Sequence, residues 1–287
     1  MIITNQFVLI NYPKTGTTFA RSAISAVYGI KNTRFTRLLR KLGIQQTALR
    51  ELTFPKLYGD YDPSYRDQHG VYRQIPDEDR SKRIVSIVRN PLYKYRSSYV
   101  YGWWKKHPPY ALEEVLKDFP TFPEISFSQF YDLLNHPRVS EDRISVPEAR
   151  SIGNYTRMFL VFYAEDPDSA ASAVITGEPL ARVVPRITFL HQETLRDELV
   201  AFLKQVGIAE AKAKRVYRLE ARNVSSQNEK SGIPKDEIKS VSTRILSDER
   251  HFLEVFPEYR EQLNQLAESG VIEAREDSIA EPRTLGG

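Results

Sequence analysis

The chain has 287 residues, which is long enough for one large α/β domain with a substantial core. Its 41 lysine and arginine residues only slightly exceed the 37 acidic residues, and they are dispersed, unlike the clustered basic residues of a nucleic-acid-binding protein. Cysteine is absent, which excludes disulfides, thiolate zinc sites, iron–sulfur clusters and cysteine nucleophiles. No apolar run approaches about 18 residues and no secretory signal begins the chain, so we expect a cytoplasmic protein without a transmembrane segment.

The first elements follow the order strand, glycine-containing turn and helix. Residues 6–12 are a nearly continuous apolar run, which is typical of a strand buried on both faces. A turn at residues 13–16 and a predicted helix over residues 17–28 complete the opening of a βαβ unit. Next, the basic amphipathic stretch at residues 33–52 predicts a helix, and residues 55–69 read as a loop rich in Tyr, Asp and Pro.

The middle of the chain contains a second predicted strand, at Arg83–Val88, which ends at Arg89. Pro91 stands at the first turn of the helix that we predict from Leu92 to about Lys105. Prolines repeatedly interrupt residues 107–150, which indicates short helices that could shape a substrate pocket or simply pack.

The last third begins with a third predicted strand, over residues 182–190. Helices are then predicted over residues 193–205, 235–247 and 249–267, with a polar loop at 222–234. The fold class expected is α/β, with one domain over residues 1–269 that has a central, mostly parallel sheet flanked by helices. The charged tail, residues 270–287, is expected to be mobile.

The first candidate site is the turn at residues 12–18, Tyr-Pro-Lys-Thr-Gly-Thr-Thr. A helix that begins here offers N–H groups without intrahelical partners and a positive dipole end, which together favour an anion. The residues that would add a charge, a close backbone approach and hydroxyl donors are Lys14, Gly16, Thr15, Thr17 and Thr18. The pattern is not the triphosphate loop Gly-x4-Gly-Lys-Ser/Thr, because the lysine precedes the glycine. A threonine-capped helix beside a surface lysine is the alternative.

The second candidate site begins at Arg89, at the carboxyl end of the second strand, where ligands of parallel sheets bind. Ser97 lies about two helical turns farther on, and an arginine fork with a hydroxyl can hold a phosphate. Arg96 and Ser98 could share this role. Alone, Arg89 would more simply pair with a carboxylate; together, the two sites imply one ligand with two anionic ends.

Tyr-Pro-Lys-Thr-Gly-Thr-Thr-Phe and Arg-Asn-Pro-x5-Ser together resemble the sulfotransferases that use 3′-phosphoadenosine-5′-phosphosulfate (PAPS). The resemblance implies a P-loop-like sulfotransferase fold and transfer of a sulfuryl group to an acceptor hydroxyl, with adenosine 3′,5′-bisphosphate (PAP) as product and no metal. Carried over, the 5′-phosphosulfate would be held by Lys14, Thr15, Gly16, Thr17 and Thr18, and the 3′-phosphate by Arg89 and Ser97. Phe19 stands where the family often has a tryptophan that stacks on adenine.

Weaker similarities to the same family occur at residues 189–195 and at Asn-Tyr-Thr-Arg157, the latter resembling carbohydrate-type members. The family's C-terminal Arg-Lys-Gly segment is missing. The residues that could replace it at the 3′-phosphate are Arg222, Ser226 and Lys230.

A hydroxyl acceptor also requires a base. His69 is our first candidate, because it precedes Arg89 by about the interval at which the family's histidine lies; His191 and Glu193 are the alternatives. The aromatic residues that could line an acceptor pocket, stack on a sugar or belong to the core are Tyr99, Tyr101, Trp103 and Trp104.

Two other functions compete with sulfuryl transfer. A nucleotide or metabolite kinase would place a magnesium-binding acid at a strand end and a lysine after the loop glycine, and neither is present. A non-catalytic phosphonucleotide-binding module would bind the nucleotide without turnover. For an enzyme, we expect a small-molecule or glycan acceptor whose identity, like the oligomeric state, is not encoded in these motifs.

Overall fold

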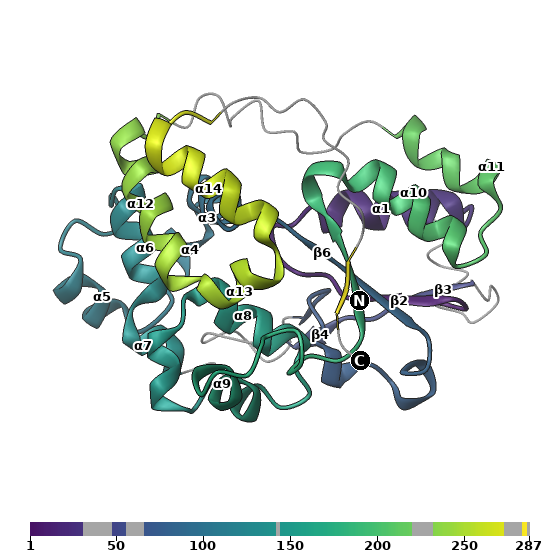
Figure 1. Cartoon of the computed structure of the whole chain (residues 1–287), viewed down its shortest axis with the longest axis horizontal. Helices are drawn as coiled ribbons and strands as arrows, with labels where there is room; N and C mark the ends of the chain where they lie inside the picture. Colours follow the sequence, from purple (N-terminus) through teal and green to yellow (C-terminus); the bar gives the residue numbers. More distant parts are fainter. Residues whose placement is uncertain (31–47, 56–65, 142–143, 220–231, 273–282, 286–287) are drawn as a thin grey trace.

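The computed structural model describes residues 1–30, 48–55, 66–141, 144–219, 232–272 and 283–285. They form an α/β domain around a central sheet of six strands in the order β3-β1-β2-β6-β7-β8 (Figure 1). The strands are β1 (Ile2–Thr4), β2 (Phe7–Leu9), β3 (Leu49–Glu51), β6 (Arg83–Val88), β7 (Ile187–His191) and β8 (Arg283–Leu285). A separate two-stranded ribbon joins β4 (Phe54–Pro55) to β5 (Arg66–Asp67).

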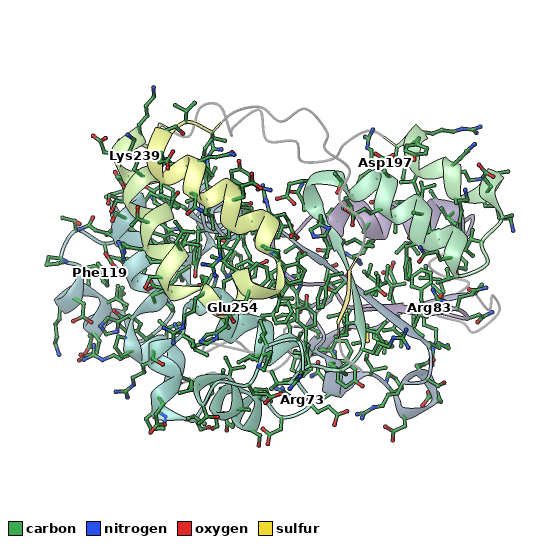
Figure 2. The ribbon with its side chains drawn as sticks, in the orientation of Figure 1. Arg73, Arg83, Phe119, Asp197, Lys239 and Glu254 are labelled. Atoms are coloured by element: carbon green, nitrogen blue, oxygen red, sulfur yellow. The ribbon has the colours of Figure 1, made fainter. Side chains whose placement is uncertain are left out.

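The centre of the sheet is parallel, because β2 pairs with β6 and β6 pairs with β7 in the same direction. The outer strands β1, β3 and β8 run antiparallel to their neighbours. Arg83, labelled in Figure 2, marks the amino end of β6. The carboxyl ends of β2, β6 and β7 therefore lie together at the opposite edge, where parallel sheets bind ligands.

Helices cover both faces of the sheet (Figure 1). One face packs against α1 (Thr17–Val27), α10 (Leu195–Gln205), α11 (Glu210–Ala213) and the 3₁₀ helix η5 (Lys214–Arg218). The other carries α3 (Pro91–Tyr101), α4 (Trp103–Lys106), α5 (Leu112–Asp118), α6 (Phe127–Asn135), α7 (Pro137–Glu141), α8 (Asn154–Tyr163), α9 (Pro167–Ile175), α12 (Lys235–Asp248), α13 (Arg250–Val255) and α14 (Pro257–Ser269). Short 3₁₀ helices are η1 (Tyr72–Gln74), η2 (Asp77–Asp79), η3 (Pro147–Ser151) and η4 (Gln192–Thr194). No helix of the described residues is long and apolar enough to cross a membrane.

Most predicted elements are confirmed, although two strands are shorter than predicted: residues 6–12 contain Phe7–Leu9, and residues 182–190 contain only the start of Ile187–His191. The helix expected from Leu92 to Lys105 stops at Gly102, whose φ of 68° ends α3 and begins α4. The helix expected over 249–267 is divided into α13 and α14, with Pro257 at the start of the second.

Three expectations differ from the structure. The helix expected over residues 33–52 is wrong at Leu49–Glu51, which forms an edge strand paired with β1; residues 33–47 lie outside the described part of the chain. The loop expected at residues 55–69 contains the strand Arg66–Asp67. In the tail that we expected to be mobile, Arg283–Leu285 pairs with β7, while most of the polar loop at 222–234 is not described.

A buried carboxylate joins the helices above the sheet. Glu249, between α12 and α13, accepts hydrogen bonds from the backbone N–H groups of Tyr155 and Thr156, each at 2.8 Å. Its oxygens also accept the hydroxyls of Tyr95 at 2.8 Å and Thr156 at 2.7 Å. The negative charge therefore caps the amino end of α8, where the helix dipole is positive. A side chain at Gly153 is excluded, because its Cβ would lie 2.3 Å from this carboxylate.

Replacing Glu249 by alanine is expected to destabilise the fold by about 3 kcal/mol or more, because each buried donor left without an acceptor costs roughly 1–3 kcal/mol. At about 2–4 °C per kcal/mol, the melting temperature should fall by roughly 6–12 °C in a thermal scan. Glu254→Ala is the control, since that exposed side chain on α13 (Figure 2) should matter little. Equal melting temperatures for the two variants would contradict the role of the cap.

Candidate functional site

The loop after β2 has a backbone that few residues adopt. Gly16 has a φ of 89° and is the N-cap of α1, and Lys14 is the non-glycine residue with positive φ, 66°, among the described residues. The Thr15 hydroxyl donates to the carbonyl of Tyr12 at 2.9 Å, and the N–H groups of Phe19 and Ala20 bond back to Gly16. The loop is thus a rigid turn that leaves the first N–H groups of α1 directed outward.

Gly16 is required for space as well as for conformation. A Cβ on Gly16 would lie 3.0 Å from Cγ of Gln192 and 3.2 Å from Cδ2 of Leu195. The loop therefore packs against the segment that follows β7, and the site is built where three parallel strands end. Thr17 is buried, whereas Thr18 is exposed at the start of α1.

Arg89 connects the two sequence motifs. Its guanidinium Nη1 donates to the carbonyl of Lys14 at 3.2 Å, which brings the ends of β2 and β6 together. The Nε of Arg89 is buried and has no hydrogen-bond partner among the described residues. A buried donor without an acceptor is costly, so this atom favours an anionic ligand.

The peptide of Arg89 is held from two directions. The Tyr155 hydroxyl donates to the carbonyl of Arg89 at 2.9 Å and accepts its N–H at 3.3 Å. The next peptide N–H, that of Asn90, donates to Glu193 at 3.1 Å, and the Asn90 side chain caps α3. Tyr155 was not predicted as a site residue, because its role depends on a contact between segments far apart in the sequence.

Arg89 lies near two other cations, Lys14 and Arg96, and we call the three residues the cation cluster. Burial of the ammonium and the positive charge of Arg89 lower the pKa of Lys14 to about 8. Burial is also the main cause that lowers the pKa of Arg96, with Arg89 adding to it. Burial likewise lowers the pKa of Arg89, while Glu193 opposes that shift. Mutual repulsion of this kind is relieved when an anion binds.

Ser97 and Ser98 are half-buried in the middle of α3, beyond Arg89. The same helix carries an unanticipated lysine, Lys94, whose buried ammonium lies 4.9 Å from the ring centre of Tyr12 and 4.7 Å from that of Tyr155. Lys94 thus packs under the residues that hold the cation cluster. Its burial had no signal in the sequence, because the surrounding helix shows no clear apolar face.

The His69 ring is held by the backbone of the segment that leads into the loop. Its Nδ1 lies 2.8 Å from the carbonyl of Asn11, three residues before Lys14 in the loop that leaves β2. A carbonyl can only accept, so Nδ1 carries the proton and Nε2 of the neutral ring is left to accept one. Burial lowers the pKa of His69 below 6.5 despite this hydrogen bond, so the ring is neutral near pH 7.

The two alternative bases have structural partners. His191 is buried between Glu198, 3.1 Å from Nδ1, and Glu258, 2.8 Å from Nε2. Burial alone would lower its pKa, but the two carboxylates outweigh it and raise the pKa to about 9. Both oxygens of Glu193 accept hydrogen bonds, from the N–H of Asn90 and from the hydroxyl of Tyr259 at 3.0 Å. The raised pKa keeps His191 protonated near neutral pH, and the Glu193 oxygens join the segment after β6 to α14.

Replacing His69 by alanine is therefore expected to lower kcat about 100-fold, which is the lower end of what a general base contributes. The effect is small because, in a loose transition state, the bond to the attacking hydroxyl has hardly formed and its proton has hardly moved. The activity that depends on His69 should rise with pH through a pKa below the ordinary histidine value, because burial lowers it, and should be level at neutral pH. His251→Ala on α13 is the matched control. Normal turnover by His69→Ala at neutral pH would require another base.

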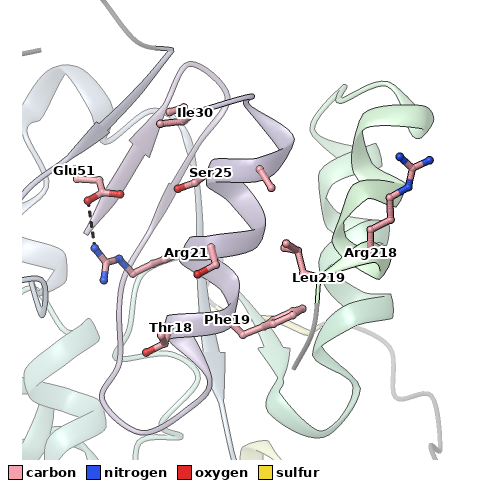
Figure 3. Close-up of a pocket in the computed structure, with 10 residues that line it drawn as sticks. Thr18, Phe19, Arg21, Ser25, Ile30, Glu51, Arg218 and Leu219 are labelled. Atoms are coloured by element: carbon pink, nitrogen blue, oxygen red, sulfur yellow. Dashed lines mark hydrogen bonds and ion pairs between the residues drawn. The ribbon is translucent and has the colours of Figure 1, made fainter. Parts of the chain in front are cut away.

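A pocket of about 450 Å³ lies along α1, beside the loop (Figure 3). Phe19 lines it together with Leu219, and Arg21 pairs with Glu51 at 3.2 Å on its other side. The Arg196 guanidinium lies 5.4 Å from the ring centre of Phe19. The volume suits one ring system of a nucleotide.

Two further groups of predicted residues do not contribute to the described site. Arg222, Ser226 and Lys230 lie outside the described residues, although Leu219, at the pocket, closely precedes them. Arg157 is buried and donates to the carbonyls of Ala149 and Ile152, so its guanidinium supports the fold of its own region.

The four aromatic residues that the sequence offered for an acceptor site divide into two pairs. Tyr99 is partly buried and stacks on the buried Trp104, and the Trp104 indole N–H donates to the Tyr99 carbonyl at 3.2 Å. Tyr101 and Trp103 are exposed at 62% and 37%. The ammonium of Lys14 lies 3.0 Å from the ring centre of Tyr101.

Comparisons with known proteins add little. No family model matches the chain, and no curated protein matches it. A search of solved structures matched the crystal structure of mouse sulfotransferase SULT7A1 complexed with PAP, at 16% sequence identity and a TM-score of 0.36. The match covers 82% of this chain and 66% of the mouse chain. Similarity at this level assigns neither a family nor an activity to the chain.

Proposed function

We propose that this protein is a sulfotransferase that binds PAPS and transfers its sulfuryl group to an acceptor hydroxyl. The observation that carries the proposal is the hydrogen bond from Arg89 to the carbonyl of Lys14. It unites two motifs that are 75 residues apart into one cationic site at the ends of parallel strands.

The residues present fit a donor with two anionic ends. The first turn of α1 and Lys14 would hold the 5′-phosphosulfate, because the helix offers backbone N–H groups and Lys14 stands two residues before its N-cap. The buried Nε of Arg89 needs an acceptor, which a 3′-phosphate would supply. Ser97 would add a hydroxyl, and Phe19 would stack on the adenine in the pocket beside α1.

The donor, when bound, supplies a sulfuryl group attached to a phosphate that departs as a stable anion. Lys14 would stabilise the charge that grows on that phosphate, which is why its positive charge matters most during transfer. Nε2 of His69 would accept the proton of the attacking hydroxyl, with the ring fixed by the Asn11 carbonyl. The rigid loop would also hold the donor in position for the transfer, which raises the rate further.

Thermal shift with nucleotides tests the proposal. PAP at about 100 times its dissociation constant should stabilise the fold by about 2.7 kcal/mol without magnesium, whereas ATP should have little effect. Adenosine 5′-monophosphate, which lacks the 3′-phosphate, is the matched control and should bind more weakly. Incubation with PAPS and a panel of alcohols and saccharides should then release PAP. Stabilisation by ATP with magnesium alone would reject the proposal in favour of a kinase, and PAP binding without any turnover would favour a binding module.

A further inference from the structure

Two exposed aromatic side chains, Tyr101 and Trp103, form what we call the aromatic ledge. Their ring centres are 6.5 Å apart and their planes differ by 21°. Gly102 lies between them with a φ of 68°, a left-handed conformation that separates α3 from α4 and places one ring on each side of the turn. His107 stacks on Trp103 with ring centres 4.1 Å apart, which braces the indole from one side.

The aromatic ledge directly adjoins the candidate reaction centre. The Lys14 ammonium lies 3.0 Å from the centre of the Tyr101 ring, a cation–π contact. The backbone carbonyl of Lys14 also accepts the hydrogen bond from Arg89, so the aromatic ledge, the loop and the second motif meet at one lysine. A molecule resting on the ledge would lie beside the group that is proposed to stabilise the departing phosphate.

Core packing does not account for the exposure of these rings. Of their sequence neighbours, Trp104 is only 5% exposed, and Tyr99 is partly buried and packs against the core. Tyr101, at 62%, is among the most exposed large apolar side chains of the described residues. Apolar surface gathered next to a binding site commonly marks an interaction surface.

We propose that the aromatic ledge is the acceptor site and that the acceptor is a saccharide, an inference that rests on the proposed function. The C–H bonds on one face of a sugar ring carry partial positive charge and pack against the negative face of an aromatic ring. An open ledge leaves the sugar hydroxyls hydrated or free to react. A phenol or another largely apolar acceptor needs a site that encloses about 70–90% of its surface, which rings this exposed do not provide.

The chain offers a built-in reporter, because it has two tryptophans, of which Trp104 is in the core. In a Trp104→Phe background, Trp103 is the remaining tryptophan. With PAP at saturation, we expect cellotetraose, chitotetraose or a chondroitin tetrasaccharide to change its emission in a saturable way. Adding Tyr101→Ala should weaken that binding by about 3- to 10-fold, the equivalent of one aromatic stacking contact. Leu116→Ala, another exposed apolar side chain, should leave it unchanged.

Transfer assays provide the second readout. Trp103→Ala should raise KM for a saccharide acceptor while the thermal shift with PAP is preserved. The inference is overturned if 2-naphthol changes the emission and the three saccharides do not, or if Tyr101→Ala binds saccharide as well as the parent and Trp103→Ala keeps the parent's KM. If the protein binds PAP but no saccharide changes the Trp103 emission, the assignment of the aromatic ledge as the acceptor site is overturned and the proposed function is not. Loss of the PAP shift in the unmodified protein instead overturns the proposed function.

Discussion

Replacing Lys14 by alanine is expected to lower the rate constant for sulfuryl transfer by about 10²–10³, the effect of removing one preorganised charge or donor from a transition state. The affinity for PAP should fall much less, because the charge that Lys14 stabilises grows mainly during transfer. Single-turnover kinetics with PAPS, alongside calorimetry with PAP, measure the two effects separately. Lys106→Ala, which removes an exposed lysine of α4, is the matched control.

The pKa of Lys14 adds a pH dependence to this expectation. Burial and Arg89 lower that pKa to about 8, and the protonated form is the active one. The Lys14-dependent part of kcat/KM should therefore be complete well below pH 8 and decline as pH rises through it, since kcat/KM reports the free enzyme. The residual activity of Lys14→Ala should lack this decline. A rate within threefold of the parent, or an unchanged alkaline limb, would contradict the role of Lys14.

For Arg89→Ala, the expected loss is in nucleotide binding. Removing one partner of a buried, hydrogen-bonded charge pair costs about 2–4 kcal/mol, so the dissociation constant for PAP should rise by about 30- to 1000-fold. Isothermal titration measures this directly. Arg83→Ala is the matched control, because Arg83 is an exposed arginine at the other end of the same strand.

A second nucleotide tests which end of the donor Arg89 holds. Adenosine 5′-phosphosulfate lacks the 3′-phosphate, so its affinity should change little in Arg89→Ala. Equal losses for the two ligands would instead assign Arg89 to the 5′ end, beside the Lys14 carbonyl. An unaltered dissociation constant for PAP would exclude Arg89 from the site altogether.

The sequence was sufficient to predict the loop and the strand before it, because an apolar run, a glycine and a helix start are local signals. It also predicted that Arg89 ends a neighbouring strand, and the structure brings that residue to Lys14. The helix predicted through Leu49–Glu51 failed because pairing with β1 outweighs local propensity at this edge.

Other parts of the site had no local signal. The enclosure of His191 by Glu198 and Glu258 requires β7, α10 and α14 to meet, which no spacing in the sequence reveals. The contrast between Tyr99 and Trp104, which pack at the core, and the exposed Tyr101 and Trp103 likewise depends on the end of α3 at Gly102. Each depends on tertiary contacts rather than on periodicity.

Tyr155 unites two structural duties in one residue. Its backbone N–H binds Glu249 and its hydroxyl binds the peptide of Arg89, so the amino end of α8 connects the helical layer to the end of β6. The backbone of Arg89 is consequently held in place by the helical layer that Glu249 joins. A substitution of Glu249 should therefore weaken nucleotide binding at temperatures at which the chain is still folded. The affinity for nucleotide should report the loss of this contact more sensitively than the melting temperature does.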